Sequence, residues 1–188
     1  MPLKLKLNAF SLSDFTEAKQ KVMAYRHGLV RKCDIFVRQL AQKGIIVGQD
    51  NLDSTDGYGK YITFGIELEH GQYGCKGLMY ATSNGIIKSQ WMTKDGVKEA
   101  DVSPLLMVEF GAGLRANNAW AATASHGRGG TGTFPGQTHA FDPEGWWYQD
   151  LGGEWHHSYG VTPTMPMGHA LSEMMDQIHS TAMEVFGK

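Results

Sequence analysis

Four histidines in the second half of the chain could carry chemistry, because imidazole nitrogens are common zinc ligands. Carboxylates stand close to them in the sequence. The histidines are His126, His139, His156 and His157, and the acids are Asp142, Glu144, Asp150 and Glu154. A catalytic zinc ion needs three nitrogen or oxygen ligands and one open position. The set therefore raises the hypothesis of a metal-dependent hydrolase that uses histidines of a loop.

The spacing of these residues argues against a zinc site. None of them forms the His-Glu-x-x-His or Cys-x-x-Cys pattern of known zinc sites. His156 and His157 are adjacent, and adjacent residues of a strand point to opposite faces, so one site could use only one of them. We therefore predict no metal and no cofactor, and we keep the hydrolase as an alternative.

Two other patterns for chemistry are incomplete. The glycine-rich segment 126–132 contains Arg128 but lacks the Gly-Lys-Ser/Thr ending of a phosphate-binding loop, and no helical pattern follows it. Glu109 could meet Glu144 or Glu154 as an acid–base pair, yet nothing in the sequence indicates raised pKa values for these carboxyls. No serine, cysteine or threonine stands in a nucleophile elbow. These features predict a protein that is not an enzyme.

Aromatic residues are the more informative group. Trp146, Trp147 and Trp155 lie within a short stretch that also holds Tyr148 and Tyr159. Because neighbouring side chains of a strand alternate between faces, one of Trp146 and Trp147 should point into the core and the other toward solvent or a partner. An exposed tryptophan is typical of the residues that anchor protein interfaces.

A long helix is expected at the start of the chain. Apolar residues recur every seven positions at Phe15, Val22, Leu29 and Phe36, and Gly44 is a natural end after Lys43. At ~1.5 Å per residue, a helix over 14–44 would be about 45 Å long. Since a compact body of this size does not need that length, part of the helix should pack on another element or another subunit.

Period-2 patterns predict strands after a polar loop at 50–59. Alternation is clean over 61–70, and strands at 75–82 and 86–93 follow, separated by turns at Gly71–Gly74 and Ser83–Gly85. A short strand over 3–7 also alternates. An antiparallel meander with the long helix on its apolar face is the simplest arrangement.

The rest of the chain reads as a loop between ordered segments. The apolar segment 105–110, interpreted as the end of a strand, leads into a turn at Gly111 and Gly113. Residues 114–145 lack periodicity and predict a long flexible loop. Strands are expected at 146–148 and 154–158. A helix over 164–186 should then bury Ala170, Leu171, Met174, Met175, Ile178, Ala182 and Val185.

Length and charge limit the class of protein. The 188 residues suit a single domain over 1–188, and 41% hydrophobic against 19% charged residues excludes a disordered chain. The net charge of -2 gives no overall basic field, although basic residues gather in the first quarter, which keeps a DNA-binding module as a second alternative. Two separate cysteines suit a reducing compartment, and no apolar run is long enough for a membrane span.

The order of these features resembles the phage tail-completion family. Its members are also described as minor tail or head–tail joining proteins, the gene-product-ten-like family of long-tailed phages and prophages. The resemblance covers 14–186: a basic long helix, a meander, Val108-Glu109-Phe110-Gly111-Ala112-Gly113, a Gly/His-rich loop, Gly145-Trp146-Trp147-Tyr148, Trp155 and a helix starting at Met165-Pro166-Met167.

This resemblance implies an α+β fold and a structural role in the virion, with no catalysis. It implies a ring of six subunits at the neck or tail top, assembled in the cytoplasm of the bacterial host, with DNA passing through the lumen. The neighbours would be a head adaptor or head-closure protein above and a tail terminator or tail tube protein below. The presumed interface residues are Glu109, Phe110, Gly111, Gly113, Arg128, Trp146, Trp147 and Trp155.

Overall fold

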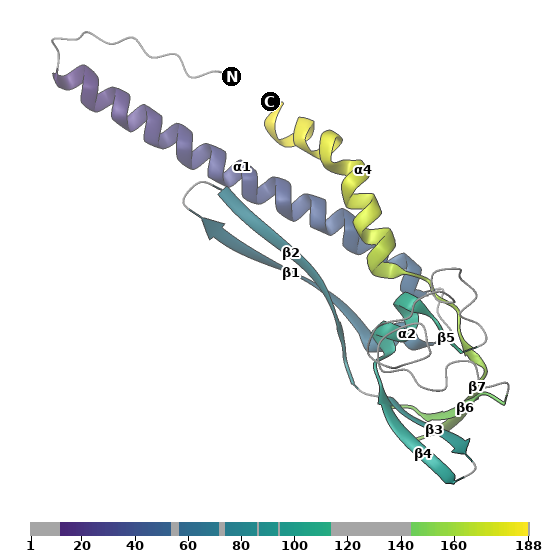
Figure 1. Cartoon of the computed structure of the whole chain (residues 1–188). Coiled ribbons are helices and arrows are strands. Elements are labelled where there is room, and N and C mark those ends of the chain that lie inside the picture. The colour runs from purple at the N-terminus through teal and green to yellow at the C-terminus, as the bar shows by residue number, and fades with distance from the viewer. Residues whose placement is uncertain are drawn as a thin grey trace. The chain divides into compact units, whose positions relative to one another are not determined.

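The computed structural model shows an α+β fold with a long N-terminal helix, a C-terminal helix and antiparallel sheets, as the sequence predicted (Figure 1). It describes residues 12–53, 57–71, 74–85, 87–93, 95–113 and 144–187. Several predictions lie outside these residues: the strand over 3–7, most of the loop over 114–145, and the roles of His126, Arg128 and His139. They stay predictions.

The first helix is longer than predicted. Helix α1 (Leu12–Asp53) has 42 residues and passes through Gly44 without ending. The predicted stop at Gly44, the separate apolar run 45–47 and the start of the polar loop at 50 are therefore wrong. The helix continues because its inward row continues, with Ala41, Gly44, Gly48 and Leu52 all buried at helical spacing. Burial of this row outweighs the tendency of glycine to end a helix.

Strands and short helices fill the middle of the chain. They begin with a 3-10 helix, η1 (Tyr58–Tyr61). The elements after η1 are β1 (Ile62–Gly71), β2 (Gly74–Ser83), β3 (Ile87–Thr93), β4 (Gly96–Val102), α2 (Pro104–Phe110), β5 (Ala112–Gly113), β6 (Trp146–Gln149), β7 (Trp155–Ser158), β8 (Gly160–Val161) and α4 (Pro166–Phe186). The strands form three sheets, with the orders β1–β2, β4–β3–β6–β7 and β5–β8.

The single meander is a wrong prediction, because β2 and β3 belong to different sheets. The segment Ser83–Gly85 is a corner and no hairpin turn. Asn84 binds back to the start of β1, with its backbone N–H donating to the carbonyl oxygen of Tyr61 at 2.5 Å and its side-chain amide to the hydroxyl of Thr63. Strand β3 pairs instead with β4 and with the distant β6. The segment 105–110 is likewise part of a helix, α2, and not a strand end.

The chain divides into two compact units. The helical unit comprises residues up to Lys43, 66–79 and 174 onward, and the sheet unit comprises 44–65 and 80–173. In the helical unit, the rings of Phe36 and Phe186 lie 5.8 Å apart. The ammonium group of Lys43 donates to Gln177 at 3.2 Å and to the buried Thr181 at 2.9 Å. These contacts join one face of α4 to α1.

The sheet unit holds the main apolar core. Helix α2 lies at its centre, since Met107 and Val108 are 1% and 0% exposed. Trp146 from β6 belongs to the same core, so a residue far along the chain from α2 helps to close it. The other members are Leu52, Tyr58, Tyr61, Ile62, Ile87, Ala112 and Val161.

Candidate functional site

The predicted turn after α2 packs against the segment before α4. The backbone turns at Gly111, whose φ of 76° lies in the region that favours glycine. Ala112 and Gly113 then pair with Val161 and Gly160 as a short antiparallel ladder. Sequence reasoning grouped these distant segments by their motifs, and the structure brings them into contact.

Glu109 completes this contact at the start of α4. Its two carboxylate oxygens accept hydrogen bonds from the backbone N–H groups of Met167 at 2.8 Å and Gly168 at 3.0 Å. The first N–H groups of a helix have no partner within the helix and carry partial positive charge, so a carboxylate stabilises them. The carbonyl oxygen of Val108 also accepts the N–H of Thr164 at 3.0 Å. The Glu109 carboxylate is thus engaged within its own chain, and Phe110 packs against the core beside it.

The tryptophans of β6 alternate as predicted. Trp146 is 9% exposed and faces the core, whereas Trp147 is 51% exposed. In the β6–β7 hairpin, Trp147 lies opposite His157 and Gln149 lies opposite Trp155. Trp155, at 40% exposure, therefore shares a face with Trp147 because it stands two residues from His157.

The outward surface of the four-stranded sheet is a flat aromatic and polar patch, which we call the aromatic sheet face. Cross-strand pairing builds it from two rows: Glu99, Gln90, Trp147 and His157; and Asp101, Lys88, Gln149 and Trp155. His157 lies between aromatic rings, with centroids 5.0 Å from Trp147 and 4.7 Å from Tyr159. Two tryptophans on a wet sheet face form the kind of surface that anchors a partner.

His156 lies on the opposite face of β7, as predicted. Its ring stacks on Tyr148 at 5.2 Å, and its Nε2 atom is 3.5 Å from Asp150 Oδ2. Hydrogen bonds from the backbone N–H groups of Glu154 and Gly152, with the nearby His156 adding to them, lower the pKa of the Asp150 carboxyl. Within the described ranges, no three His, Cys, Asp or Glu residues come together as a metal site.

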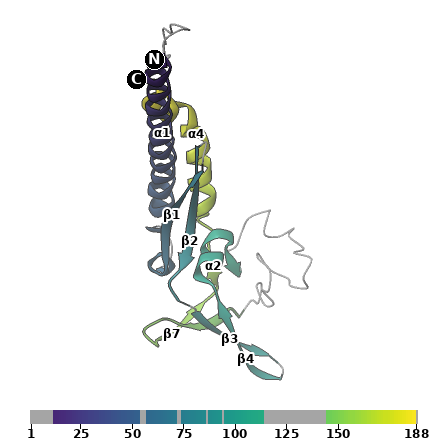
Figure 2. The same cartoon turned by 90° about the vertical axis from the view of Figure 1, so that its left-hand side faces the viewer.

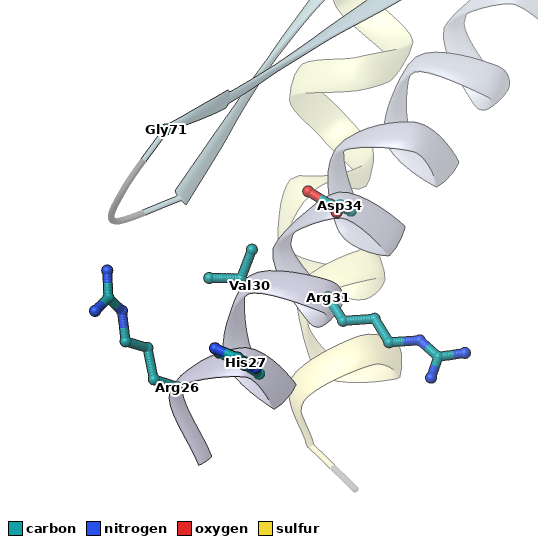
Figure 3. A pocket seen from close by; sticks show the side chains of 6 residues that line it. All are labelled: Arg26, His27, Val30, Arg31, Asp34 and Gly71. Atoms are coloured by element: carbon teal, nitrogen blue, oxygen red, sulfur yellow. The ribbon is translucent and has the colours of Figure 1, made fainter. Parts of the chain in front are cut away.

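A second cluster, missed at the level of sequence, lies in the helical unit. An open hollow of about 430 Å³ is lined by Arg26, His27, Val30, Arg31, Asp34 and Gly71 (Figure 3). Arg26 and Val30 extend toward the tip of the β1–β2 hairpin, whereas Arg31 points away from it. The sequence showed the basic residues of α1. It could not show that the β1–β2 hairpin lies beside them, because that depends on tertiary packing.

Asp34, the acidic residue of this hollow, interacts with two neighbours, His70 and Cys75. Asp34 Oδ1 lies 3.2 Å from His70 Nδ1, at ion-pair distance but outside hydrogen-bonding geometry. Burial raises the pKa of the Cys75 thiol to about 11, and its hydrogen bond to Asp34 adds to the effect. The thiol is therefore protonated at neutral pH and is a poor nucleophile, because the thiolate is the reactive form.

Two helix faces of the helical unit are apolar and exposed. The first is on α1, where Phe15, Val22 and Leu29 are 49%, 47% and 39% exposed. The second is on α4, where Met175 and Ile178 are 64% and 48% exposed. The predicted inward stripe of the last helix is thus only partly right. Ala170 is buried, but Leu171, Met175 and Ile178 face outward.

The chain matches no known protein-family model, no curated protein and no solved structure. Among the helices of the described segments, none combines the length and the apolarity that crossing a membrane requires.

Proposed function

We propose that this chain is a structural virion protein of a tailed bacteriophage or prophage, which completes the neck or tail top and joins head to tail as a ring of subunits. One observation carries the proposal: in the described part of the chain, more large apolar side chains are exposed than buried. They gather on the exposed apolar faces of α1 and α4 described above and on the aromatic sheet face. Large exposed apolar patches mark interaction surfaces.

Two groups that could have carried chemistry favour a structural role. Glu109 caps α4, and burial raises the pKa of the Cys75 thiol, which makes it a poor nucleophile. The order of motifs along the chain resembles tail-completion proteins, and this supports the placement at the neck.

The aromatic sheet face is the surface that we assign to the neighbouring virion proteins. Its acidic residues Glu99 and Asp101 stand at the β4 side, and Trp147 and Trp155 stand at the β7 side. A head adaptor or head-closure protein above, or a tail terminator or tail tube protein below, would cover this face. The tryptophans would then be the anchors, because large aromatic side chains contribute most to such interfaces.

The test is complementation of a phage that lacks the gene. Without the protein, we expect filled heads and separate tails under the electron microscope, and wild-type protein should restore joined particles. The double variant Trp147→Ala/Trp155→Ala should fold but restore few infectious particles. Leu151→Ala is the matched control, since Leu151 is 57% exposed in the β6–β7 turn but not on the sheet face. Joined particles in the complete absence of the protein would refute the proposal.

A DNA-binding module is the second candidate, because Arg26, His27 and Arg31 line one hollow. Cationic side chains bind DNA phosphates with an affinity that falls steeply with salt. We expect Arg26→Ala/Arg31→Ala to lower the salt dependence of duplex binding if this candidate is right. In a ring, the same residues could face DNA in the lumen. A free protein with no salt-dependent DNA affinity would exclude the module.

A further inference from the structure

The first part of α1 has little cover in its own unit. At its N-terminal end the helix extends past the hairpin and past the end of α4 (Figures 1 and 2). We call Leu12–Leu29 the free half of α1, although Arg26 and His27 within it line the hollow beside Gly71. Every residue from Lys19 to Leu29 is exposed. The free half is about five turns long, and a helix of that length is marginally stable in water by itself. As a continuation of a packed helix it needs no nucleus of its own, and a partner that covers its apolar residues would stabilise it further.

The apolar residues of the free half form a seam for another helix. Phe15, Val22 and Leu29 repeat every seven residues, and Ala18 and Tyr25 fall between them with alternating spacings of three and four. This is the spacing of a coiled-coil seam, whose apolar residues interlock with a facing helix. The positions flanking the seam carry the basic residues Lys19, Lys21 and Arg26 and the acidic Asp14, and Lys21 is paired with Glu17 on its own helix. Three basic and two acidic residues leave the free half with a net charge of +1.

Helix α4 offers a second uncovered apolar face. Its inward side is occupied, since Gln177 and Thr181 accept hydrogen bonds from Lys43. On the other side Met175, Ile178 and Met183 are 64%, 48% and 60% exposed. The charged residues of α4 are all acidic: Asp176 borders the outer face, and Glu173 and Glu184 fall on the row of Gln177 at helical spacing.

We infer that the free half of α1 in one copy packs on the outer face of α4 in a second copy. Two free halves of α1 would each bring a net charge of +1, so their contact would join surfaces of the same net sign, whereas the three acids of α4 give it a net charge of -3. The chain's own segments outside the structure are not acidic either: 1–11 carries Lys4 and Lys6, and 114–143 carries Arg115, Arg128 and Asp142. Helix α4 combines an uncovered apolar face with the opposite charge.

This contact joins two different surfaces, so it is heterologous. Each copy offers one free half of α1 and one outer face of α4, and repetition either closes a ring or gives an open filament. The inference deepens the proposed ring function and rests on it for the closure of the ring. The contact itself does not depend on a virion and can be measured with purified protein.

Mixing two blocked variants tests the contact. Val22→Asp blocks the seam of α1, and Ile178→Asp blocks the outer face of α4. We expect wild-type protein to form oligomers at hundred-micromolar concentration in sedimentation velocity, and each variant alone to associate at least about tenfold more weakly, the equivalent of ~1.4 kcal/mol. Mixed at equal concentration, the variants should form a dimer that does not grow, because one intact surface of each kind remains.

Other outcomes overturn the inference. If α1 paired with α1, the Ile178→Asp variant would still associate alone and the Val22→Asp variant would stay monomeric in the mixture. A wild-type protein that is monomeric at hundred-micromolar concentration would also refute the contact. Circular dichroism of each variant shows whether it is folded.

Charge reversal provides a second test that leaves the apolar seam intact. Lys19→Glu/Lys21→Glu/Arg26→Glu should weaken self-association. A partner copy with Glu173→Lys/Asp176→Lys/Glu184→Lys should restore it even when this copy also carries Val22→Asp, which leaves only the reversed pair of surfaces to associate. Lys98→Glu, at an exposed lysine of β4, is the matched control and should change nothing. Failure of the reversed pair to recover association would contradict the assigned pairing. If the mixing result holds but phage necks assemble without the protein, the contact stands and the neck function falls.

Discussion

The turn after α2 and the free half of α1 differ in how much of their surface contacts the rest of the chain. At the turn, Glu109 and Val108 use their carboxylate and carbonyl oxygens on the segment that starts α4, and Ala112 is buried. On the free half of α1, Phe15 and Val22 have no apolar cover. One region is completed by its own chain, whereas we propose that the other is completed by another chain.

The largest expected effect compares two methionines. Met107 in α2 is 1% exposed, and Met23 in the free half of α1 is 49% exposed. Met107→Ala should lower the free energy of unfolding by about 2–5 kcal/mol, since it leaves a cavity in the core. Met23→Ala should change it by less than about 0.5 kcal/mol. Urea unfolding of dilute protein measures both, and equal losses would refute the contrast.

The next effect concerns the carboxylate that caps α4. Glu109→Ala should cost about 1–3 kcal/mol, because it leaves the N–H groups of Met167 and Gly168 without their acceptors. Glu184→Ala, at an exposed position near the other end of the same helix, serves as the control and should stay within about 0.5 kcal/mol of wild type. Thermal unfolding monitored by circular dichroism distinguishes the two. An unchanged melting temperature for Glu109→Ala would show that the cap contributes no stability.

Alanine substitutions at two glycines of α1 should change the stability of the protein in opposite directions. A Cβ atom at Gly48 would lie 2.6 Å from Phe64 Cζ, whereas a Cβ atom at Gly28 would meet nothing within 4 Å. Gly48→Ala should destabilise by about 1–3 kcal/mol because the ring must move. Gly28→Ala should stabilise by about 0.5–1 kcal/mol because alanine favours the helix. Denaturant midpoints measure both changes, and stabilisation by Gly48→Ala would show that α1 does not approach β1 this closely.

The smallest effect is on the reactivity of Cys75. With its pKa raised from 9.0 to about 11, the thiolate fraction at pH 8 is about 100-fold lower than that of an ordinary thiol. Alkylation by iodoacetamide, followed by peptide mass spectrometry, should be slower by about that factor than in urea-unfolded protein. Because the pKa is higher in the folded state, the stability that this thiol contributes is present below pH 9 and is lost as the pH rises through 11. Equal rates in the two states would contradict the burial of this thiol.

Local patterns located several strands and placed the start of α4 within two residues, but they missed β4, β5 and β8. Alternation located β1, β6 and β7 closely, and it separated Trp146 from Trp147 and His156 from His157 onto opposite faces. Period-2 patterns report which residues share a face, so these features follow from the sequence. Pairing of strands does not, because β3 and β6 meet across a long segment of chain.

The sequence misled where tertiary packing overrode a local preference. Gly44 has the features of a helix end, yet its row is buried and α1 continues to Asp53. Asn84 has the features of a hairpin turn, yet it binds back to Tyr61 and redirects the chain. The cap formed by Glu109 and the hollow beside Arg26 depend on residues far apart in sequence. No local pattern suggested either of them, although the ordered series of motifs did group the two segments that the cap joins.

The helical unit joins segments that lie far apart in the chain, and this has a consequence for translation. Phe36 and Lys43 of α1 contact Phe186, Gln177 and Thr181, which the ribosome adds about 130 to 150 residues later. Helix α1 therefore leaves the ribosome well before the helix on which this part of it packs. We expect a nascent chain to keep these residues of α1 uncovered until α4 has been made.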